Sequence, residues 1–191
     1  MKLLLSLFTL VICVTGAIGQ SSAGQACTDK TVENISSRGI KIGANAELLK
    51  STFDLQESSS LVRKEVGSET LSVRPRPEKE RFQGISSYRF DFLDGQLVSY
   101  LVSYAKPNWL DLSQYVSKVV ELFDLPSIEN WSVDGPRATL LCGNYELTAV
   151  IEGGQSSYFA INDKRLDETL AARKKKLEDQ QRENDIRAFK P

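Results

Sequence analysis

Residues 86–104 constrain the fold more than any other stretch, because apolar and polar residues alternate there on both sides of an Asp94-Gly95 pair. Such alternation is typical of a half-buried β-strand, and Asp-Gly is a preferred hairpin turn. The large side chains of both strands would share one face: Tyr88, Phe90, Phe92, Val98, Tyr100, Val102 and Tyr104. The stretch therefore predicts a β-hairpin with one apolar face that a second layer must cover.

The register of this hairpin depends on the length of its loop. A two-residue turn would pair Phe92 with Leu97, whereas a three-residue loop would place Phe90 opposite Val98. The longer loop keeps the large residues together, and a slip of one residue moves a whole apolar set across a sheet. We therefore predict the longer loop, with Gly95 in the left-handed conformation.

The N-terminal residues are typical of an exported protein. Met1-Lys2 is followed by an apolar run that ends in small residues, which predicts a signal peptide at residues 1–19. The run is shorter than the ~20 apolar residues of a membrane-spanning helix. Cys27 lacks a leucine three residues before it, which argues against a lipid anchor. We expect a soluble periplasmic or extracellular protein with a flexible leader at residues 20–30.

Removal of this signal would leave Cys27 and Cys142 as the cysteines of the mature chain. An even count in an oxidising compartment predicts a disulfide bond between them. The alternative is that Cys142, which lies in an apolar strand, is a buried free thiol.

Residues 38–53, RGIKIGANAELLKSTF, begin with a short β-like run and continue into a helix capped by Asn45. This stretch resembles the opening of small periplasmic α+β modules of the BamE (SmpA/OmlA) and β-lactamase-inhibitor-protein type. In those modules a Gly-Met-Ser/Thr-x-x-Glu-Val pattern begins a helix that packs on an antiparallel sheet. Here Ala44 takes the place of the Met, Asn45 that of the Ser or Thr, and Glu47 comes one position early. The resemblance implies an architecture, a bacterial source and binding to other proteins, and it transfers no functional residue.

The remaining patterns predict an α+β domain at residues 31–163 with an antiparallel sheet and two helices packed on one of its faces. Asp111 begins a helix with one apolar stripe, and strands follow at residues 138–142, 145–152 and 157–161. Helix followed by strands occurs twice, which leaves open two α/β repeats that share one sheet. Residues 54–82 are expected to form a long loop with one strand near residues 69–73.

The last segment, residues 164–191, predicts a charged helix and tail. Asp163 would cap the helix, and leucines at 166 and 170 would dock it on the domain. Because the apolar line fades after Leu177, the part beyond should project into water.

The chemistry open to the chain is limited because it contains no histidine. This excludes Ser-His-Asp and Cys-His catalytic sites and histidine-bound zinc. Asp91 and Asp94 could form an acid–base pair for glycoside hydrolysis, but a position on a strand face and a position in a turn explain them without catalysis. Asp163 and Asp167 lack the spacing of a calcium loop. We predict no catalytic residue, no cofactor and no metal site.

The predicted function is that of an exported, non-enzymatic module that binds another protein in the bacterial envelope. The candidate partner-binding residues are the basic run and the terminal aromatic residue of the last helix: Arg173, Lys174, Lys175, Lys176 and Phe189. A formal net charge of −1 gives no field that favours nucleic acid. The alternatives are a carboxylate-dependent, glycosidase-like hydrolase and a structural envelope protein without a discrete site.

Overall fold

The computed structural model describes residues 26–53, 56–75, 82–105, 111–152 and 156–189, so the predicted signal peptide lies outside the described residues. The elements in chain order are α1 (Asp29–Asn34), α2 (Ala46–Phe53), β1 (Gln56–Arg63), η1 (Lys64–Val66), β2 (Ser68–Arg74), β3 (Ile85–Leu93), β4 (Gln96–Ala105), α3 (Leu112–Phe123), η3 (Ile128–Asn130), β5 (Ser132–Asp134), β6 (Arg137–Cys142), β7 (Tyr145–Glu152), β8 (Ser156–Asp163) and α4 (Leu166–Ala188).

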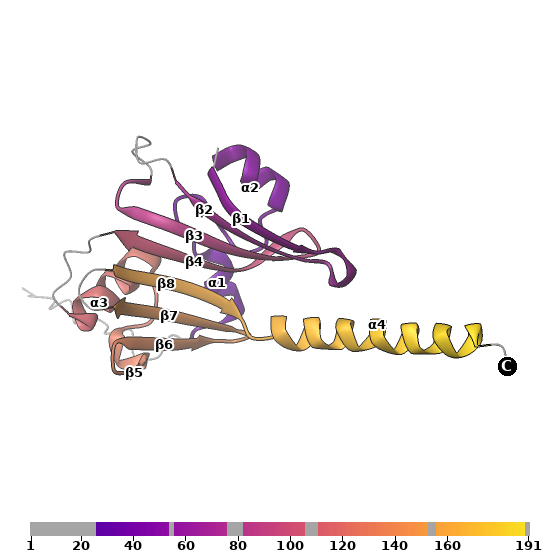
Figure 1. The fold of residues 1–191 in the computed structure, drawn as a ribbon. Helices are drawn as coiled ribbons and strands as arrows, with labels where there is room; N and C mark the ends of the chain where they lie inside the picture. The colour runs from indigo at the N-terminus through magenta and orange to yellow at the C-terminus, as the bar shows by residue number, and fades with distance from the viewer. Residues whose placement is uncertain (1–25, 54–55, 76–81, 106–110, 153–155, 190–191) are drawn as a thin grey trace, which may run out of the picture.

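The strands of the described residues form one eight-stranded antiparallel sheet in the order β1-β2-β3-β4-β8-β7-β6-β5 (Figure 1). Strands β1 to β4 follow one another across one half, and β5 to β8 fill the other half in reverse order, so β4 and β8 meet in the middle. The predicted α+β class with an antiparallel sheet is confirmed. The two predicted α/β repeats and the packing of two helices on one face stay predictions.

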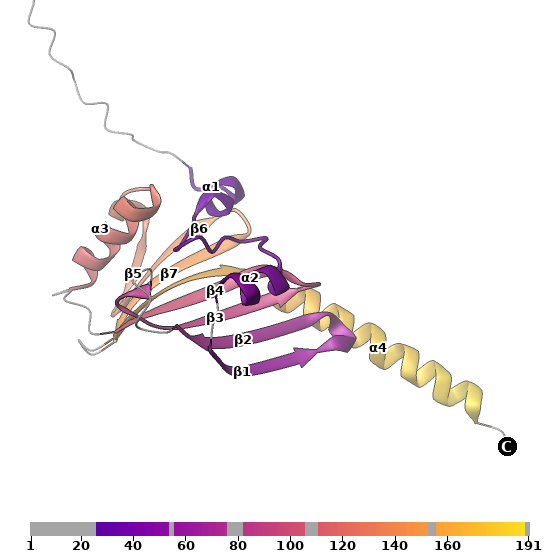
Figure 2. The same ribbon diagram turned by 90° about the horizontal axis from the view of Figure 1, so that it is seen from above.

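One face of the sheet carries the hydrophobic core, and we call it the helix face because α1, α2 and α3 lie on its side in Figure 2. Tyr88, Phe90, Phe92, Tyr100 and Val102 of the predicted apolar set are buried there, whereas Val98 is only partly buried and Leu97 is buried in its place. From α3, Phe123 stacks on Phe159 of β8 with ring centroids 5.1 Å apart. From α2, Lys50 binds Glu69 of β2 at 2.7 Å.

We call the opposite side of the sheet the open face. Since side chains alternate along a strand, it carries the residues between those of the core. Those nearest its middle are mostly small or uncharged: Thr70, Ser72, Arg89, Asp91, Ser99, Leu101, Ser103, Thr148, Val150, Tyr158 and Ala160.

The predicted register of the central hairpin is wrong. Phe92 pairs with Leu97 around a two-residue turn in which Asp94 (φ 51°) and Gly95 (φ 79°) are both left-handed, the geometry of a type I′ turn. A β-bulge at Val98 then shifts the pairing by one residue, so that Leu97, Tyr100 and Val102 face the same side as Phe92, Phe90 and Tyr88. The prediction that Gly95 is left-handed is confirmed.

The expected long loop at residues 54–82 is also wrong in large part. Strands β1 and β2 form an antiparallel hairpin there, closed by η1 and by Gly67 with φ 69°. Leu71 and Val73 of β2 pair with residues of β3 and extend the core. The serine-rich β1 lacks an apolar alternation, and its pairing with β2 determines its structure.

Two predicted helix caps are confirmed. The Asn45 side-chain oxygen accepts hydrogen bonds from the backbone N–H groups of Glu47 (3.0 Å) and Leu48 (3.2 Å). Asp111 accepts one from the N–H of Gln114 at 2.8 Å. Both interactions satisfy amide groups that a first helical turn leaves without a partner.

Candidate functional site

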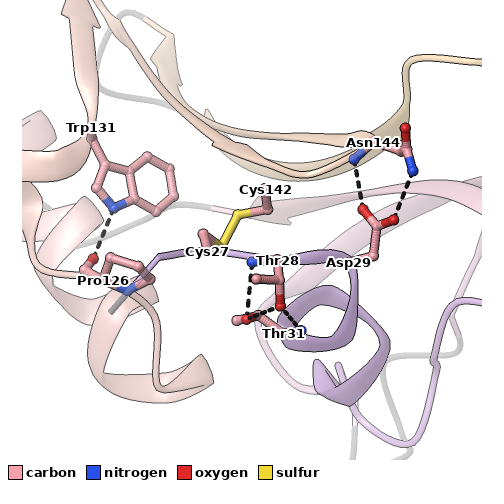
Figure 3. The surroundings of a disulfide bond; sticks show 8 residues. All are labelled: Cys27, Thr28, Asp29, Thr31, Pro126, Trp131, Cys142 and Asn144. Carbon is pink, nitrogen blue, oxygen red and sulfur yellow. Dashed lines mark hydrogen bonds between the residues drawn. A yellow bond between two sulfur atoms is a disulfide. The ribbon is translucent and has the colours of Figure 1, made fainter. Parts of the chain in front are cut away.

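The predicted disulfide bond joins Cys27 to Cys142, with Cα atoms 4.5 Å apart (Figure 3). It links the residue before the cap of α1 to the last residue of β6. Thr28 and Thr31 form a capping box at the start of α1, which begins at Asp29 inside the segment expected to be a leader. Because disulfide-bonded cysteines are not nucleophiles, this pair is structural.

A second contact beside the disulfide fastens α1 to the turn between β6 and β7. The Asp29 carboxylate accepts hydrogen bonds from the backbone N–H (2.6 Å) and the side-chain amide (2.7 Å) of Asn144 (Figure 3). The Asn144 carbonyl in turn accepts from the N–H of Lys164, directly before α4. The start of α1 is therefore connected to the start of α4.

Asp163 does not cap α4 as predicted, since the helix begins at Leu166 with Arg165 as its N-cap and no side-chain cap bond. Asp163 instead accepts from the Arg165 backbone N–H at 2.9 Å and pairs with its guanidinium at 2.9 and 2.7 Å. Burial raises the pKa of Asp163, but these hydrogen bonds and the charge of Arg165 outweigh burial and hold the pKa below its usual value. The junction between β8 and α4 is thus held by an ionised carboxylate.

Arg173 clamps α4 to the tips of two hairpins. Its guanidinium donates to both carboxylate oxygens of Asp94 (2.8 and 2.7 Å) and to the carbonyl of Val66 (2.8 Å). The Asp94 N–H also donates to the Gly67 carbonyl at 2.7 Å, so the two tips contact each other. We call Arg173, Asp94 and Val66 the clamp, and it fixes the direction of a helix that has no buried residue.

The predicted partner-binding residues of α4 therefore differ in their surroundings. Arg173 is used by the clamp, and Lys174 lies 3.8 Å from Glu178. Lys175 and Lys176 are exposed, and Phe189 is 76% exposed near the end of α4, which extends away from the sheet (Figure 1).

The clamp should respond to acid in a defined direction. Hydrogen bonds from Arg173 lower the pKa of Asp94, so the stabilisation by Asp94 is complete above its unfolded pKa of about 3.9 and is lost as the pH falls through the lowered value. We expect a carbon-13 NMR titration to give a midpoint below about 3.9 for Asp94 in the wild type and a midpoint near 3.9 in Arg173→Met. Equal midpoints in the two proteins would contradict the clamp.

Gly67 should resist substitution more than a left-handed glycine with open space around it, such as Gly84. At Gly67 a Cβ atom would collide with the Asp94 carboxylate and the Arg173 guanidinium, whereas at Gly84 (φ 81°) it would meet nothing within 4 Å. Gly84→Ala therefore reports backbone strain alone, about 1 kcal/mol. Gly67→Ala should lower the free energy of unfolding by at least about twice as much, because overpacking adds strain. Urea denaturation of both variants would measure the difference, and equal losses would argue against close packing at the clamp.

A hollow on the open face lies between the β1–β2 hairpin and the start of α4, with a volume of about 560 Å³. Thr70, Asp91 and Ser99 line it from the sheet, and Asp163 and Asp167 line it from the junction and first turn of α4. Asp91 accepts a hydrogen bond from Thr70 at 2.7 Å. Asp91 and Asp94, the pair weighed as an acid–base site and set aside, do not meet in this hollow, because Asp94 belongs to the clamp and does not line it.

An apolar hollow of about 450 Å³ lies on the other side of the molecule, beside α3. Tyr104, Tyr115 and Val119 contribute to its lining together with Leu122, which is 69% exposed. Burial raises the pKa of Tyr104 to about 12, so its hydroxyl stays protonated at neutral pH. Lys118 and Glu121, which form an ion pair at 2.6 Å, complete the described lining of this mainly apolar hollow.

Within the described residues, no group of three or more Cys, Asp or Glu side chains is arranged to hold a metal ion. No helix in the described part combines the length and apolarity needed to cross a membrane. Comparison of the chain with protein-family models, curated proteins and solved structures gave no match.

Proposed function

We propose that this chain is an exported, non-enzymatic module that binds another protein through the open face of its sheet. One observation carries the proposal: the helical residues that line the hollow on the open face all come from the start of α4, whereas the ribbons of α1, α2 and α3 lie on the side of the helix face in Figure 2. An extended sheet with one face left without a covering layer is a ready surface for a partner.

The residues of the open face suit a protein partner. Small side chains, of which Ser99, Thr148 and Ala160 are buried between their neighbours, let another backbone approach the sheet closely. Tyr158 and Arg89 are of the residue types that contribute most to protein–protein affinity. Leu141, which is 61% exposed, adds apolar area towards the β5 edge. A protein partner could therefore bury a continuous surface there.

The finer features of the fold are part of the proposal. Helix α2 precedes β1 to β4, and α3 precedes β5 to β8, so each half of the sheet follows one helix. We regard the halves as two α/β repeats whose helices pack on the same face. Such an arrangement would cover one face twice and leave the other face continuous. The resemblance of residues 38–53 to BamE-like and β-lactamase-inhibitor-like modules agrees with this view, since those modules bind proteins.

Export to the periplasm is supported by the disulfide bond, because such bonds persist in oxidising compartments. The projecting end of α4 would then contribute Lys175, Lys176 and Phe189 as a second contact with the partner.

A carboxylate-dependent hydrolase is the second candidate, because Asp91, Asp163 and Asp167 line one hollow. Glycoside hydrolysis requires that one of two carboxyl groups be protonated at working pH. The lowered pKa of Asp163 leaves it ionised, and its oxygens are occupied by Arg165. A binding surface therefore accounts for the molecule better than an acid–base site does.

Site-specific photo-crosslinking tests the proposed face. Benzoylphenylalanine would replace Tyr158 or Leu141 on the open face, Phe189 on α4, and Leu48 or Leu122 as exposed controls on the helix layer. The proteins would be exported into the native envelope and irradiated. We expect the same crosslinked protein from Tyr158 and Leu141, and from Phe189 if the helix end takes part, but not from Leu48 or Leu122. Crosslinks from the controls alone, or from all positions equally, would refute the proposal.

A further inference from the structure

The hollow on the open face is one part of a longer groove, which runs between α4 and the β1–β2 hairpin. A second hollow of about 480 Å³ adjoins the first, since Arg63 and Leu170 line both. On the β1–β2 side, Leu61 lines the first hollow and Val66 the second, while Leu166 and Leu177 line them in turn from α4. Each wall thus offers apolar side chains along its length, and we call the two hollows together the α4 groove.

The length of this groove fits an extended chain. At about 1.5 Å per residue, α4 from Leu166 to Leu177 is about 16 Å long. An extended peptide covers that distance with about five residues at about 3.3 Å each. The clamp lies along the same stretch of α4 and holds this wall against the hairpin tips, so the groove is formed before anything binds.

The charged side chains that line the groove favour an occupant that carries both an acidic and a basic side chain. On its floor, Asp91 already binds Thr70 and lies 3.5 Å from Arg89, and Asp163 is paired with Arg165. On its walls, Arg63 and Glu65 of the hairpin and Asp167 of α4 are exposed and form no ion pair with any described residue, whereas Lys174 of α4 lies 3.8 Å from Glu178. A cation on one wall and a carboxylate on the other complement an occupant that carries an acidic and a basic side chain.

We propose that the α4 groove binds an extended segment of about five residues from a protein partner. Apolar side chains of that segment would pack between Leu61 and the leucines of α4. An acidic side chain would pair with Arg63 and a basic one with Asp167. This inference rests on the proposed function, because it specifies how part of the partner would be held at one end of the open face.

A peptide library tests the groove without knowledge of the partner. Random dodecapeptides displayed on phage would be selected on the mature chain with its disulfide intact, and synthetic copies of enriched peptides would be bound in solution. NMR spectra of methyl-labelled protein should show shifts at Leu61, Leu166 and Leu170. The proposal fails if no peptide is enriched, if shifts appear elsewhere, or if free amino acids bind as tightly as the peptide.

Charge reversal provides the matched control. Arg63→Glu should weaken an enriched peptide at least about tenfold, and a peptide with its acidic residue changed to lysine should recover most of that loss. Arg137→Glu reverses another exposed arginine, on β6 outside the groove, and should change the affinity less than about twofold. Equal effects of the two variants, or no recovery with the lysine peptide, would overturn the pairing with Arg63.

The two proposals can fail independently. If Tyr158 crosslinks a partner but no peptide enters the groove, the groove inference is wrong and the open-face function stands. If peptides bind the groove but Tyr158 and Leu141 crosslink nothing, the open-face function is wrong and the groove stands as a peptide-binding site.

Discussion

Replacing both Cys27 and Cys142 by alanine is expected to lower the free energy of unfolding by about 3–5 kcal/mol. The bond joins residues separated by 115 positions, and a crosslink that closes so long a loop restricts the unfolded chain strongly. Cys142 is also fully buried, so its removal takes a side chain out of the core. Urea denaturation followed by tryptophan fluorescence would measure the loss.

Reduction of the wild type provides the control for this prediction. The reductant should lower the stability of the wild type to nearly that of the double variant and should leave the double variant unchanged. A loss of less than about 1 kcal/mol in both experiments would mean that Asp29 and Asn144 fasten α1 without help from the disulfide.

Phe90→Ala should cost about 3–5 kcal/mol of stability, because it removes a large side chain from the centre of the helix face. Phe90 is fully buried, its ring stacks on that of Tyr88 with centroids 5.3 Å apart, and it pairs across the sheet with Leu71 and Tyr100. The substitution leaves a cavity that these neighbours can fill only in part. Urea denaturation would again give the difference in free energy.

The neighbouring Arg89 is the matched control for the two faces of the sheet. Its side chain points to the open face and is 61% exposed, so Arg89→Ala should change stability by no more than about 0.5 kcal/mol. If Arg89→Ala were as costly as Phe90→Ala, the open face would be covered in the native protein, and the proposed function would lose its basis.

The central hairpin illustrates how far the sequence determines this fold. Alternation identified its strands and its apolar face, because the pleat repeats every two residues. The register could not be obtained in the same way, since a bulge at Val98 restores the apolar pairing that the two-residue turn would otherwise break. Bulges have no reliable signal in one sequence, and Asp94-Gly95 is compatible with either loop length.

Strand β1 was missed for a different reason. Its serines have little preference for a strand, and it is an edge strand whose pairing with β2 comes from the hairpin closed by Gly67. Gly67 is itself a turn signal in the sequence, because glycine readily adopts the left-handed conformation that closes a hairpin. The expected long loop did not take this signal into account.

The contacts that position the candidate site could not be predicted from local patterns. Arg173 and Asp94 are 79 residues apart, and Asp29 and Asn144 are 115 apart. The sequence predicts correctly that Asp94 lies in a turn, but only the tertiary structure brings that turn to α4. The alternation of polar and buried residues in β3 agrees with the alternation in the sequence, so the polar face of this strand could be predicted.

The affinity of the crosslinked partner for two variants tests the central claim, recognition through the open face, most directly. Biolayer interferometry would compare the wild type with Tyr158→Arg on the open face and Leu122→Arg on α3. We predict that Tyr158→Arg weakens binding at least about thirtyfold, the ~2 kcal/mol typical of a central interface residue, and that Leu122→Arg changes it less than about twofold. Unchanged binding by Tyr158→Arg together with a large loss in Leu122→Arg would place the partner on the helix layer and contradict the account.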